Sequence, residues 1–226
     1  AVRWIGGQVE ALALPFGPSS EARDVNSEGA ICGFMGSASA GRPGTRRGFV
    51  WKDGAVTEIA APMGESAEAN AINDEGTVVG FRLLPNPNGG TLQRAFVWKD
   101  GTMTSIEPLP GFASTNALAI NDAGVVVGTM GSGVVFVWHG GAPVLFSNLA
   151  ALPAHHAPIA IGSINDVGQF SCLMRRTLPN AQPSVLDRPA RCSPIAPTGD
   201  IDCDGVVDAA DLALVLGSWG PCPAEA

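Results

Sequence analysis

A unit of about 47 residues occurs four times in this chain, and this repetition restricts the possible folds more than any other feature. Each unit contains an asparagine turn of the form V/I-N-x-x-G. The four asparagines are separated by 47, 48 and 44 residues: Asn26, Asn73, Asn121 and Asn165. Each unit also contains a tryptophan followed by a glycine turn, at residues 3–7, 50–54, 97–101 and 137–141. Two signatures that recur in phase indicate one structural unit repeated four times.

The residues around both signatures are typical of short antiparallel strands. A-N-A-I precedes the second asparagine turn and T-V-V-G-F follows it, and R-G-F-V-W and A-V-T-E-I flank the second tryptophan turn. Both turn sequences favour tight hairpins with a residue of positive φ at the tip. Four-stranded units of this length are typical of propeller blades. We therefore predict an all-β fold, a β-propeller of four-stranded blades over residues 1–188, with the tryptophans packed between blades.

The order of the signatures suggests how the ring closes. The chain begins with a tryptophan hairpin, the second half of a blade, and its last repeat is an asparagine hairpin, the first half of one. Pairing of residues 2–13 with the strands at 157–173 would complete four blades and remove both open edges. The alternative is a fragment of a larger propeller whose edges stay exposed.

Residues 200–211 read D-I-D-C-D-G-V-V-D-A-A-D and predict a calcium loop. Carboxylates fall at loop positions one, three, five, nine and twelve, and glycine falls at position six, as in an EF-hand. The expected ligands are five side chains and one main-chain carbonyl: Asp200, Asp202, Asp204, Asp208 and Asp211, with the carbonyl of Val206. Many oxygens in a flexible loop favour Ca²⁺ over Mg²⁺ as the bound cofactor.

The calcium loop leads into A-D-L-A-L-V-L-G-S-W-G, whose apolar residues share one helical face. Loop and helix together resemble a type I dockerin repeat over residues 199–222. The resemblance implies calcium binding and, as a possible partner, a cohesin-like or cell-surface protein. A full dockerin has two such repeats, whereas this chain has one, and Ala209 and Ala210 stand where cohesin binders often carry Ser-Thr. We expect a linker over 189–199 and the calcium module over 200–226.

The body resembles a known family as well. The pattern A-x-x-I-N-D-x-G-x-V-V-G followed by A-F-V-W-x-x-G is similar to the HAF-type extracellular repeat family over about residues 1–172. This resemblance implies an exported protein, extracellular or at the cell surface, although the chain itself shows no signal peptide. It implies no reaction.

Charge and composition exclude several classes of function. The net charge is −8, and six acids with no base follow residue 191, whereas the preceding residues are nearly neutral. The body is therefore not expected to bind nucleic acid. No apolar run approaches the roughly 18 residues of a membrane span. Cys222 has two candidate disulfide partners, Cys192 and Cys203, and sequence does not choose between them, while Cys32 and Cys172 are expected in the core.

The sequence contains no recognisable catalytic constellation. It has no G-x-S-x-G motif and no P-loop. It also has no tyrosine, which a sialidase needs as nucleophile. The repeat acids Asp74, Asp122 and Asp166 are best explained as turn residues. We therefore expect a non-catalytic exported protein that binds or scaffolds on extracellular glycan, the alternative being a polysaccharide hydrolase or lyase that carries a dockerin-like module.

Arginines suggest where a ligand would bind. The connectors between the second and third strands of each unit are expected on one rim, at 35–47, 82–93, 129–133 and about 174–184. The predicted ligand-binding residues in them are Arg46, Arg47, Arg175 and Arg176, which we call the basic rim. Guanidinium groups suit the carboxylates or sulfates of an acidic polysaccharide. The alternative is that these arginines only keep exposed loops soluble.

Overall fold

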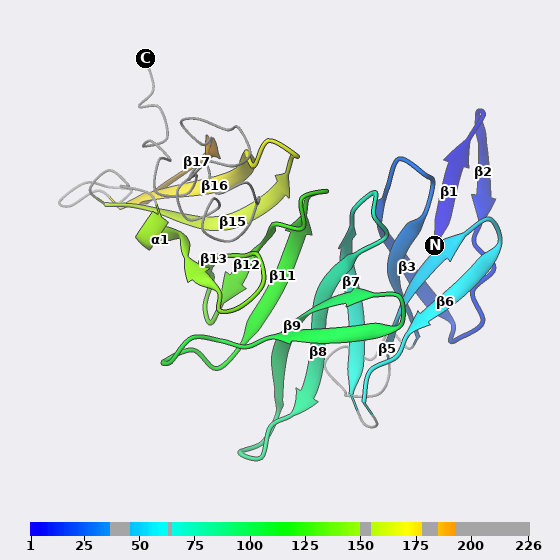
Figure 1. Cartoon of the computed structure of the whole chain (residues 1–226), viewed down its shortest axis with the longest axis horizontal. Helices are drawn as coiled ribbons and strands as arrows, with labels where there is room; N and C mark the ends of the chain where they lie inside the picture. The colour runs from blue at the N-terminus through cyan, green and yellow to red at the C-terminus, as the bar shows by residue number, and fades with distance from the viewer. Residues whose placement is uncertain (37–45, 63–64, 150–154, 178–184, 193–226) are drawn as a thin grey trace, which may run out of the picture. The chain divides into compact units, whose positions relative to one another are not determined.

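The computed structural model describes residues 1–36, 46–62, 65–149, 155–177 and 185–192. The chain divides into two compact units, Ala1–Ala117 and Leu118–Ala226. The described residues form antiparallel β-sheets and one short helix, α1 (Phe146–Leu149) (Figure 1). Three of the sheets have four strands, so the predicted all-β fold of four-stranded units is confirmed at that level. No helix among these residues is long and apolar enough to span a membrane.

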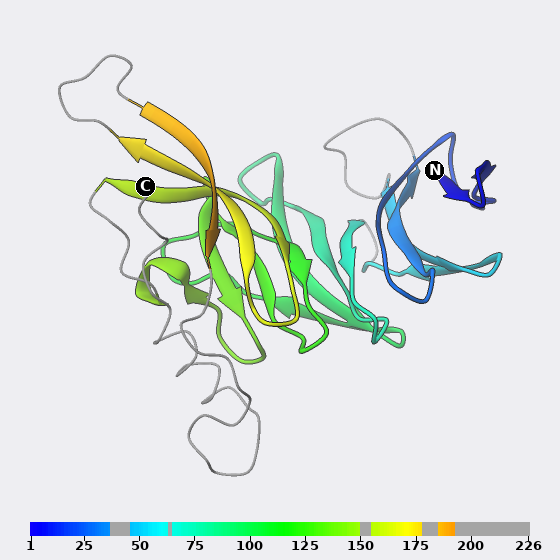
Figure 2. The same cartoon turned by 90° about the horizontal axis from the view of Figure 1, so that it is seen from above.

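The first unit contains one hairpin and two four-stranded sheets, each built in chain order. The hairpin consists of β1 (Val2–Ile5) and β2 (Gln8–Ala11) and lies at one end of the unit, beyond β3 (Figure 2). The first four-stranded sheet consists of β3 (Ser19–Val25), β4 (Ile31–Gly36), β5 (Arg46–Lys52) and β6 (Ala55–Ile59). The second consists of β7 (Ser66–Ile72), β8 (Val78–Pro85), β9 (Thr91–Lys99) and β10 (Thr102–Ile106).

The second unit contains the third four-stranded sheet and a three-stranded sheet. The third sheet consists of β11 (Thr115–Ile120), which begins at the end of the first unit, β12 (Val126–Met130), β13 (Val134–Trp138) and β14 (Val144–Leu145). The last sheet consists of β15 (His156–Ile164), β16 (Phe170–Thr177) and β17 (Val185–Cys192). Because β17 runs to Cys192, strand structure continues beyond residue 188, into the segment predicted as linker.

The predicted pairing of residues 2–13 with 157–173 is not formed among the described residues. β16 pairs with β15 along one edge and with β17 along the other, from Phe170↔Cys192 to Thr177↔Val185. β1 pairs as a strand with β2 alone. Residues 185–192 thus supply the third strand that the sequence assigned to the N-terminus. They lack the tryptophan signature, so sequence comparison between the repeats did not reveal them.

The asparagine turns have the predicted geometry, with one difference. In the second turn the N–H of Gly76 donates to the carbonyl of Asn73 at 3.0 Å, and Gly76 has a φ of +72°. The Asn73 side chain also accepts a hydrogen bond of 2.8 Å from the N–H of Thr77, four residues on, whereas an asparagine in a turn was expected to bond the backbone two residues on. The same side-chain bond recurs in the other three turns, from Ala30 to Asn26, Val125 to Asn121 and Gln169 to Asn165.

The first three tryptophan turns are two-residue hairpins, whereas the fourth, between Val137 and Val144, is longer. Lys52 pairs with Ala55 across one of them, and both central residues, Asp53 and Gly54, have positive φ, at 50° and 86°. Two consecutive positive φ values define a type I′ turn, whose twist matches that of the flanking strands. The predicted position of this turn is therefore correct, but it contains two residues of positive φ and not the one that was expected.

Apolar side chains between neighbouring sheets form the core. In the first unit Cys32 and Ile59 of one sheet pack against residues of the next, among them Phe96 and Trp98. In the second unit the rings of Phe146 and Phe170 meet edge to face, with centroids 5.1 Å apart, in a cluster that includes Cys172. The prediction that Cys32 and Cys172 lie in the core is confirmed. Trp51 and Trp98 are buried as expected, whereas Trp4 is exposed.

Hydrogen bonds between successive asparagine turns connect neighbouring sheets. The Asn26 side chain donates to the carbonyl of Asn73 at 3.0 Å, and the N–H of Ser27 donates to Asp74 at 2.8 Å. The second unit repeats both bonds, from Asn121 to Asn165 at 3.1 Å and from Asp122 to Asp166 at 2.9 Å. We call this series of contacts the turn ladder. It has a direction within each unit, because the first turn donates to the second and the third turn donates to the fourth.

Candidate functional site

The predicted calcium loop, Asp200 to Asp211, lies outside the described residues, as do Cys203 and Cys222. Its ligands therefore stay a prediction. Within the described part of the chain, no three His, Cys, Asp or Glu side chains are grouped so that they would hold a metal ion.

The first two residues of the basic rim lie in a strand and not in a connector. Arg46 and Arg47 open β5, and because they are adjacent their side chains point to opposite faces of the sheet. Arg47 donates to both carboxylate oxygens of Glu58 at 3.0 Å, and its guanidinium stacks 4.0 Å from the centre of the Phe16 ring. Arg46 donates to the buried carboxylate of Glu68. Both positive charges therefore already have an acidic partner.

The other two residues of the basic rim lie on β16. Arg175 makes a bidentate contact with Asp187 of β17, at 2.9 and 2.8 Å. The side-chain hydrogen bond from Arg175 lowers the pKa of Asp187 and keeps this carboxylate ionised. Arg176 is exposed and belongs to no ion pair within the described residues. Carboxylates of the chain itself thus engage three of the four rim arginines, which leaves Arg176 alone available to an acidic ligand.

A buried ionic cluster lies between the two four-stranded sheets of the first unit. Glu68 of β7 has a side-chain exposure of 2% and accepts hydrogen bonds from two arginines of the neighbouring sheet. Arg23 bonds one oxygen at 2.7 Å and Arg46 bonds the other. Both guanidinium groups lie over the Phe34 ring, at 4.9 and 4.5 Å from its centre. Two cations and an aromatic face keep the Glu68 carboxylate in place away from water.

A cleft of about 480 Å³ opens beside this cluster. Phe81 and Leu83 of β8 form an apolar wall, and polar groups of β9 and of the segment before β11 lie around it. The lining residues used below are Arg46, Glu68, Phe81, Leu83, Thr91, Gln93 and Ser114. An apolar wall with a few convergent hydrogen-bonding groups is typical of small-molecule sites. The cleft is therefore a candidate binding site of the first unit.

The cleft does not carry the groups that glycoside hydrolysis requires. That reaction uses two carboxyl groups on either side of the scissile bond. Among the described lining residues Glu68 is the single carboxylate, and arginines engage both of its oxygens. His139 lies in the other unit, where Nε2 is 3.0 Å from the carbonyl oxygen of Ala123. The described lining residues therefore lack the second carboxyl group that this mechanism uses.

Sequence comparison did not identify Glu68 as a site residue, because no equivalent was recognised in the other repeats. The structure supplies one. Glu21 stands across from Phe34 as Glu68 stands across from Phe81, 47 residues later. Glu21 is exposed and pairs with Arg23 at 2.9 Å. Counting back from each turn asparagine, five residues in both repeats, would have aligned the two glutamates.

No family model matches the sequence, and no curated protein matches it. Among solved structures, the chain is similar to the β-propeller domain of the trilobed protease from Pyrococcus furiosus, described as having an open velcro topology. The TM-score is 0.47 and the sequence identity is 11%, over 76% of this chain and 48% of that one. The chain thus spans about half the length of that structure.

Proposed function

We propose that the protein is an exported, non-catalytic binding protein, a β-propeller of four-stranded blades that holds extracellular glycan and carries a calcium-binding, dockerin-like tail. The observation that carries the binding role is the composition of the cleft. The C–H faces of a sugar ring suit the apolar wall of Phe81 and Leu83, and its hydroxyls suit Gln93 and Ser114. Arg23 and Arg46 together carry one positive charge more than the Glu68 carboxylate neutralises, which favours a sugar that bears a carboxylate.

Titration of the full chain with short oligouronates and with matched neutral oligosaccharides tests this role by calorimetry. We expect the acidic sugars to bind more tightly, and Gln93→Ala or Ser114→Ala to weaken binding by roughly tenfold, since each removes one hydrogen bond to a ligand. Gln8→Ala, an exposed glutamine on β2, is the matched control and leaves binding unchanged. Equal affinity in all three variants, or no binding by the parent, would contradict the proposal.

The tail has a separate role in this proposal. Asp200, Asp202, Asp204, Asp208 and Asp211 with the carbonyl of Val206 bind Ca²⁺, and the ordered tail attaches the protein to a cohesin-like or cell-surface partner. Five carboxylates in twelve residues repel one another unless a cation neutralises them, which supports the assignment.

Calorimetry of the full chain with Ca²⁺ and then Mg²⁺ tests the tail. We expect Ca²⁺ to bind at one site and with the higher affinity, and Asp204→Asn to remove that binding. Glu225→Gln, a tail acid outside the loop, is the control and keeps it. Binding that survives Asp204→Asn would show that the loop is not the site.

A further inference from the structure

Four arginines concentrate positive charge on the last sheet of the chain. β16 and β17 contain one acid, Asp187, and four bases: Arg175, Arg176, Arg188 and Arg191. Arg175 already holds Asp187 in the bidentate contact described above. β15 contains no acid. The three strands therefore carry more positive charge than their own carboxylate neutralises.

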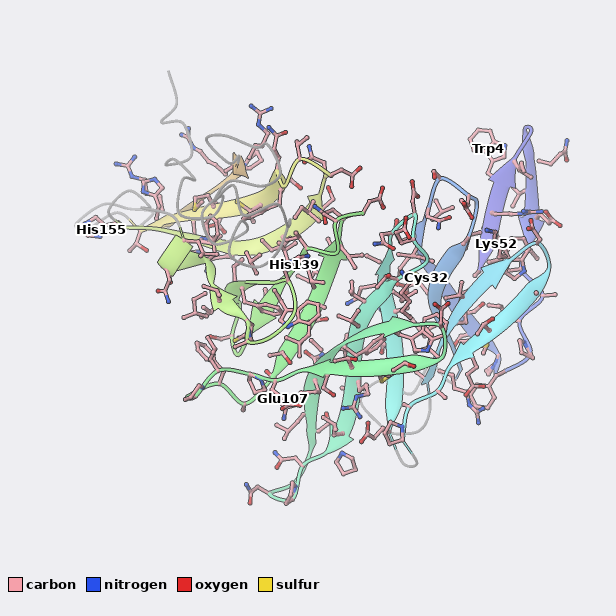
Figure 3. All side chains as sticks on the ribbon, in the orientation of Figure 1. Trp4, Cys32, Lys52, Glu107, His139 and His155 are labelled. Atoms are coloured by element: carbon pink, nitrogen blue, oxygen red, sulfur yellow. The ribbon has the colours of Figure 1, made fainter. Side chains whose placement is uncertain are left out.

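Three basic side chains share one face at one end of this sheet. Arg176 of β16 lies across from His156 of β15. Arg188 of β17 lies across from Met174, two positions along β16, so Arg176 and Arg188 are diagonal neighbours about 7–8 Å apart. His155, labelled in Figure 3, directly precedes β15 and marks this end of the sheet. We call Arg176, Arg188 and His156 the basic end.

The basic end lies where the apolar core of the sheet stops. Met174 on the same face is buried, whereas Arg176 is exposed and belongs to no ion pair within the described part of the chain. Asp187 precedes Arg188 and therefore points to the opposite face, because side chains alternate along a strand. The three strands thus supply no carboxylate to the face of the basic end. Neighbouring like charges repel each other, so this face favours an anionic partner.

The chain itself contains a strongly acidic segment. Residues 200–211, D-I-D-C-D-G-V-V-D-A-A-D, carry five aspartates and no base. Its first three aspartates alternate with other residues, and alternate residues of an extended backbone lie about 6.6 Å apart. This spacing is close to that of Arg176 and Arg188. Charge and spacing therefore make the segment complementary to the basic end.

A short connection keeps the acidic segment near the sheet. Seven residues, 193–199, separate Cys192, the end of β17, from Asp200. This connection can span at most about 28 Å. Arg188 lies about 13 Å back along β17 from Cys192. The aspartates are therefore within reach of the basic end, and the covalent connection raises their local concentration there.

We propose that, when calcium is absent, the acidic segment 200–211 docks on the basic end of the last sheet of the same chain. The guanidinium groups of Arg176 and Arg188 donate charge-assisted hydrogen bonds to its first three aspartates. Calcium requires the same carboxylates, so it releases the segment for the cohesin-like or cell-surface partner proposed above. The calcium step rests on the proposed calcium loop, whereas the docking itself does not.

Docking and calcium binding compete for the same carboxylates. Calcium binds only the released segment, so docking lowers the apparent calcium affinity in proportion to the released fraction. Removal of an arginine of the basic end should therefore tighten calcium binding. The long-range field of an arginine would also act from Arg191, which is closer in sequence to Asp200 but lies on the opposite face, across from Ser171. Arg191 is thus the matched control for Arg188.

Calorimetric titration of the full chain with Ca²⁺ measures this competition. We expect Arg176→Ser or Arg188→Ser to raise the calcium affinity by about fivefold or more, and Arg191→Ser to leave it nearly unchanged. No gain in the first two variants, or an equal gain in all three, overturns the calcium step. If the parent binds no Ca²⁺, the proposed calcium loop is wrong, and the docking is decided by the cross-linking experiment below.

Carbodiimide cross-linking of the full chain tests the contact directly, because this reagent joins an amine to a carboxylate that touches it. The chain has two lysines, Lys52 and Lys99, so Arg188→Lys adds one amine and keeps the charge. Without calcium we expect mass spectrometry to find the introduced lysine joined to residues 200–211, and Arg191→Lys to give no such product. Absence of the product overturns the docking. A product that persists with bound Ca²⁺ overturns the release.

Discussion

The main-chain N–H of Ser27 donates a hydrogen bond of 2.8 Å to one carboxylate oxygen of Asp74, and the Ser27 hydroxyl donates one of 2.6 Å to the other. The two residues lie 47 positions apart and occupy equivalent places in successive turns. The aspartate of the N-D-x-G sequence thus serves the preceding turn and joins neighbouring sheets. The same aspartate therefore accounts both for the recurrence of the N-D-x-G motif and for the hydrogen bonds that hold neighbouring sheets together.

Removal of this carboxylate should loosen the contact between the two sheets. We expect Asp74→Ala to lower the midpoint of thermal unfolding by roughly 2 °C, and Asp74→Asn by less, because an amide oxygen still accepts one bond. Circular dichroism measures the midpoint. Glu75→Ala is the control in the same turn, since its carboxylate is 4.0 Å from Lys99 and strongly exposed. Equal effects at the two positions would show that the ladder contributes nothing.

The same contact makes stability depend on pH. The hydrogen bonds from the hydroxyl and then the N–H of Ser27 lower the pKa of Asp74 in the folded chain. A depressed carboxyl pKa adds stability above the unfolded value, about 3.9, and that stability is lost as the pH falls through the folded value. We therefore expect the stability difference between the parent and Asp74→Asn to be constant near neutrality, to shrink as the pH falls below about 3.9, and to vanish below the pKa of Asp74 in the folded chain. A difference that grows in acid would contradict this assignment.

The buried Glu68 should be the most sensitive charged position of the first unit. Glu68→Ala leaves Arg23 and Arg46 beside each other without their shared carboxylate, which costs about 3 kcal/mol. Urea unfolding of the full chain measures this cost. Glu58→Ala removes an exposed partner of Arg47 and should cost less than about 1 kcal/mol. A similar cost for the two substitutions would mean that burial of the ion cluster has no energetic consequence.

Short-range features of the fold were predictable because each depends on a few adjacent residues. Asp53 and Gly54 define a hairpin whatever surrounds them, and Asn73 with Gly76 defines another. Burial of Cys32 followed from its place in the repeat. These features determine where strands begin and end, and hence the four-stranded units.

Long-range features were not predictable in the same way. Arg23 and Arg46 are 45 and 22 positions away from Glu68 in the sequence. They contact Glu68 only because the two sheets pack face to face. β17 has the sequence V-L-D-R-P-A-R-C, whose alternation does not resemble the other third strands. Its pairing with β16 depends on an available edge more than on its own propensity. The length of a strand beyond its hairpin also depends on its neighbours, so the rim arginines were predicted in connectors although they lie in β5 and β16.

Gly80 should tolerate no side chain, because β8 passes unusually close to β7 there. A Cβ at Gly80 would lie 2.0 Å from the carbonyl oxygen of Glu68, next to the bulge between Ala69 and Ala71, and a Cβ at Gly33 would lie 1.9 Å from the carbonyl oxygen of Glu21. Both obstacles are main-chain atoms, so relief requires a strand to move. We expect Gly80→Ala to cost about 3 kcal/mol in urea unfolding.

The matched control for Gly80 is Gly76, in the turn four residues earlier. Gly76 has a φ of +72° and open space around a new Cβ, so Gly76→Ala meets only the strain of the left-handed backbone, about 1 kcal/mol. Gly80→Ala should also weaken sugar binding in the cleft, because movement of β8 displaces Phe81, whereas Gly76→Ala should not. If Gly80→Ala costs no more than Gly76→Ala, the close approach of β7 and β8 is not a feature of the folded protein.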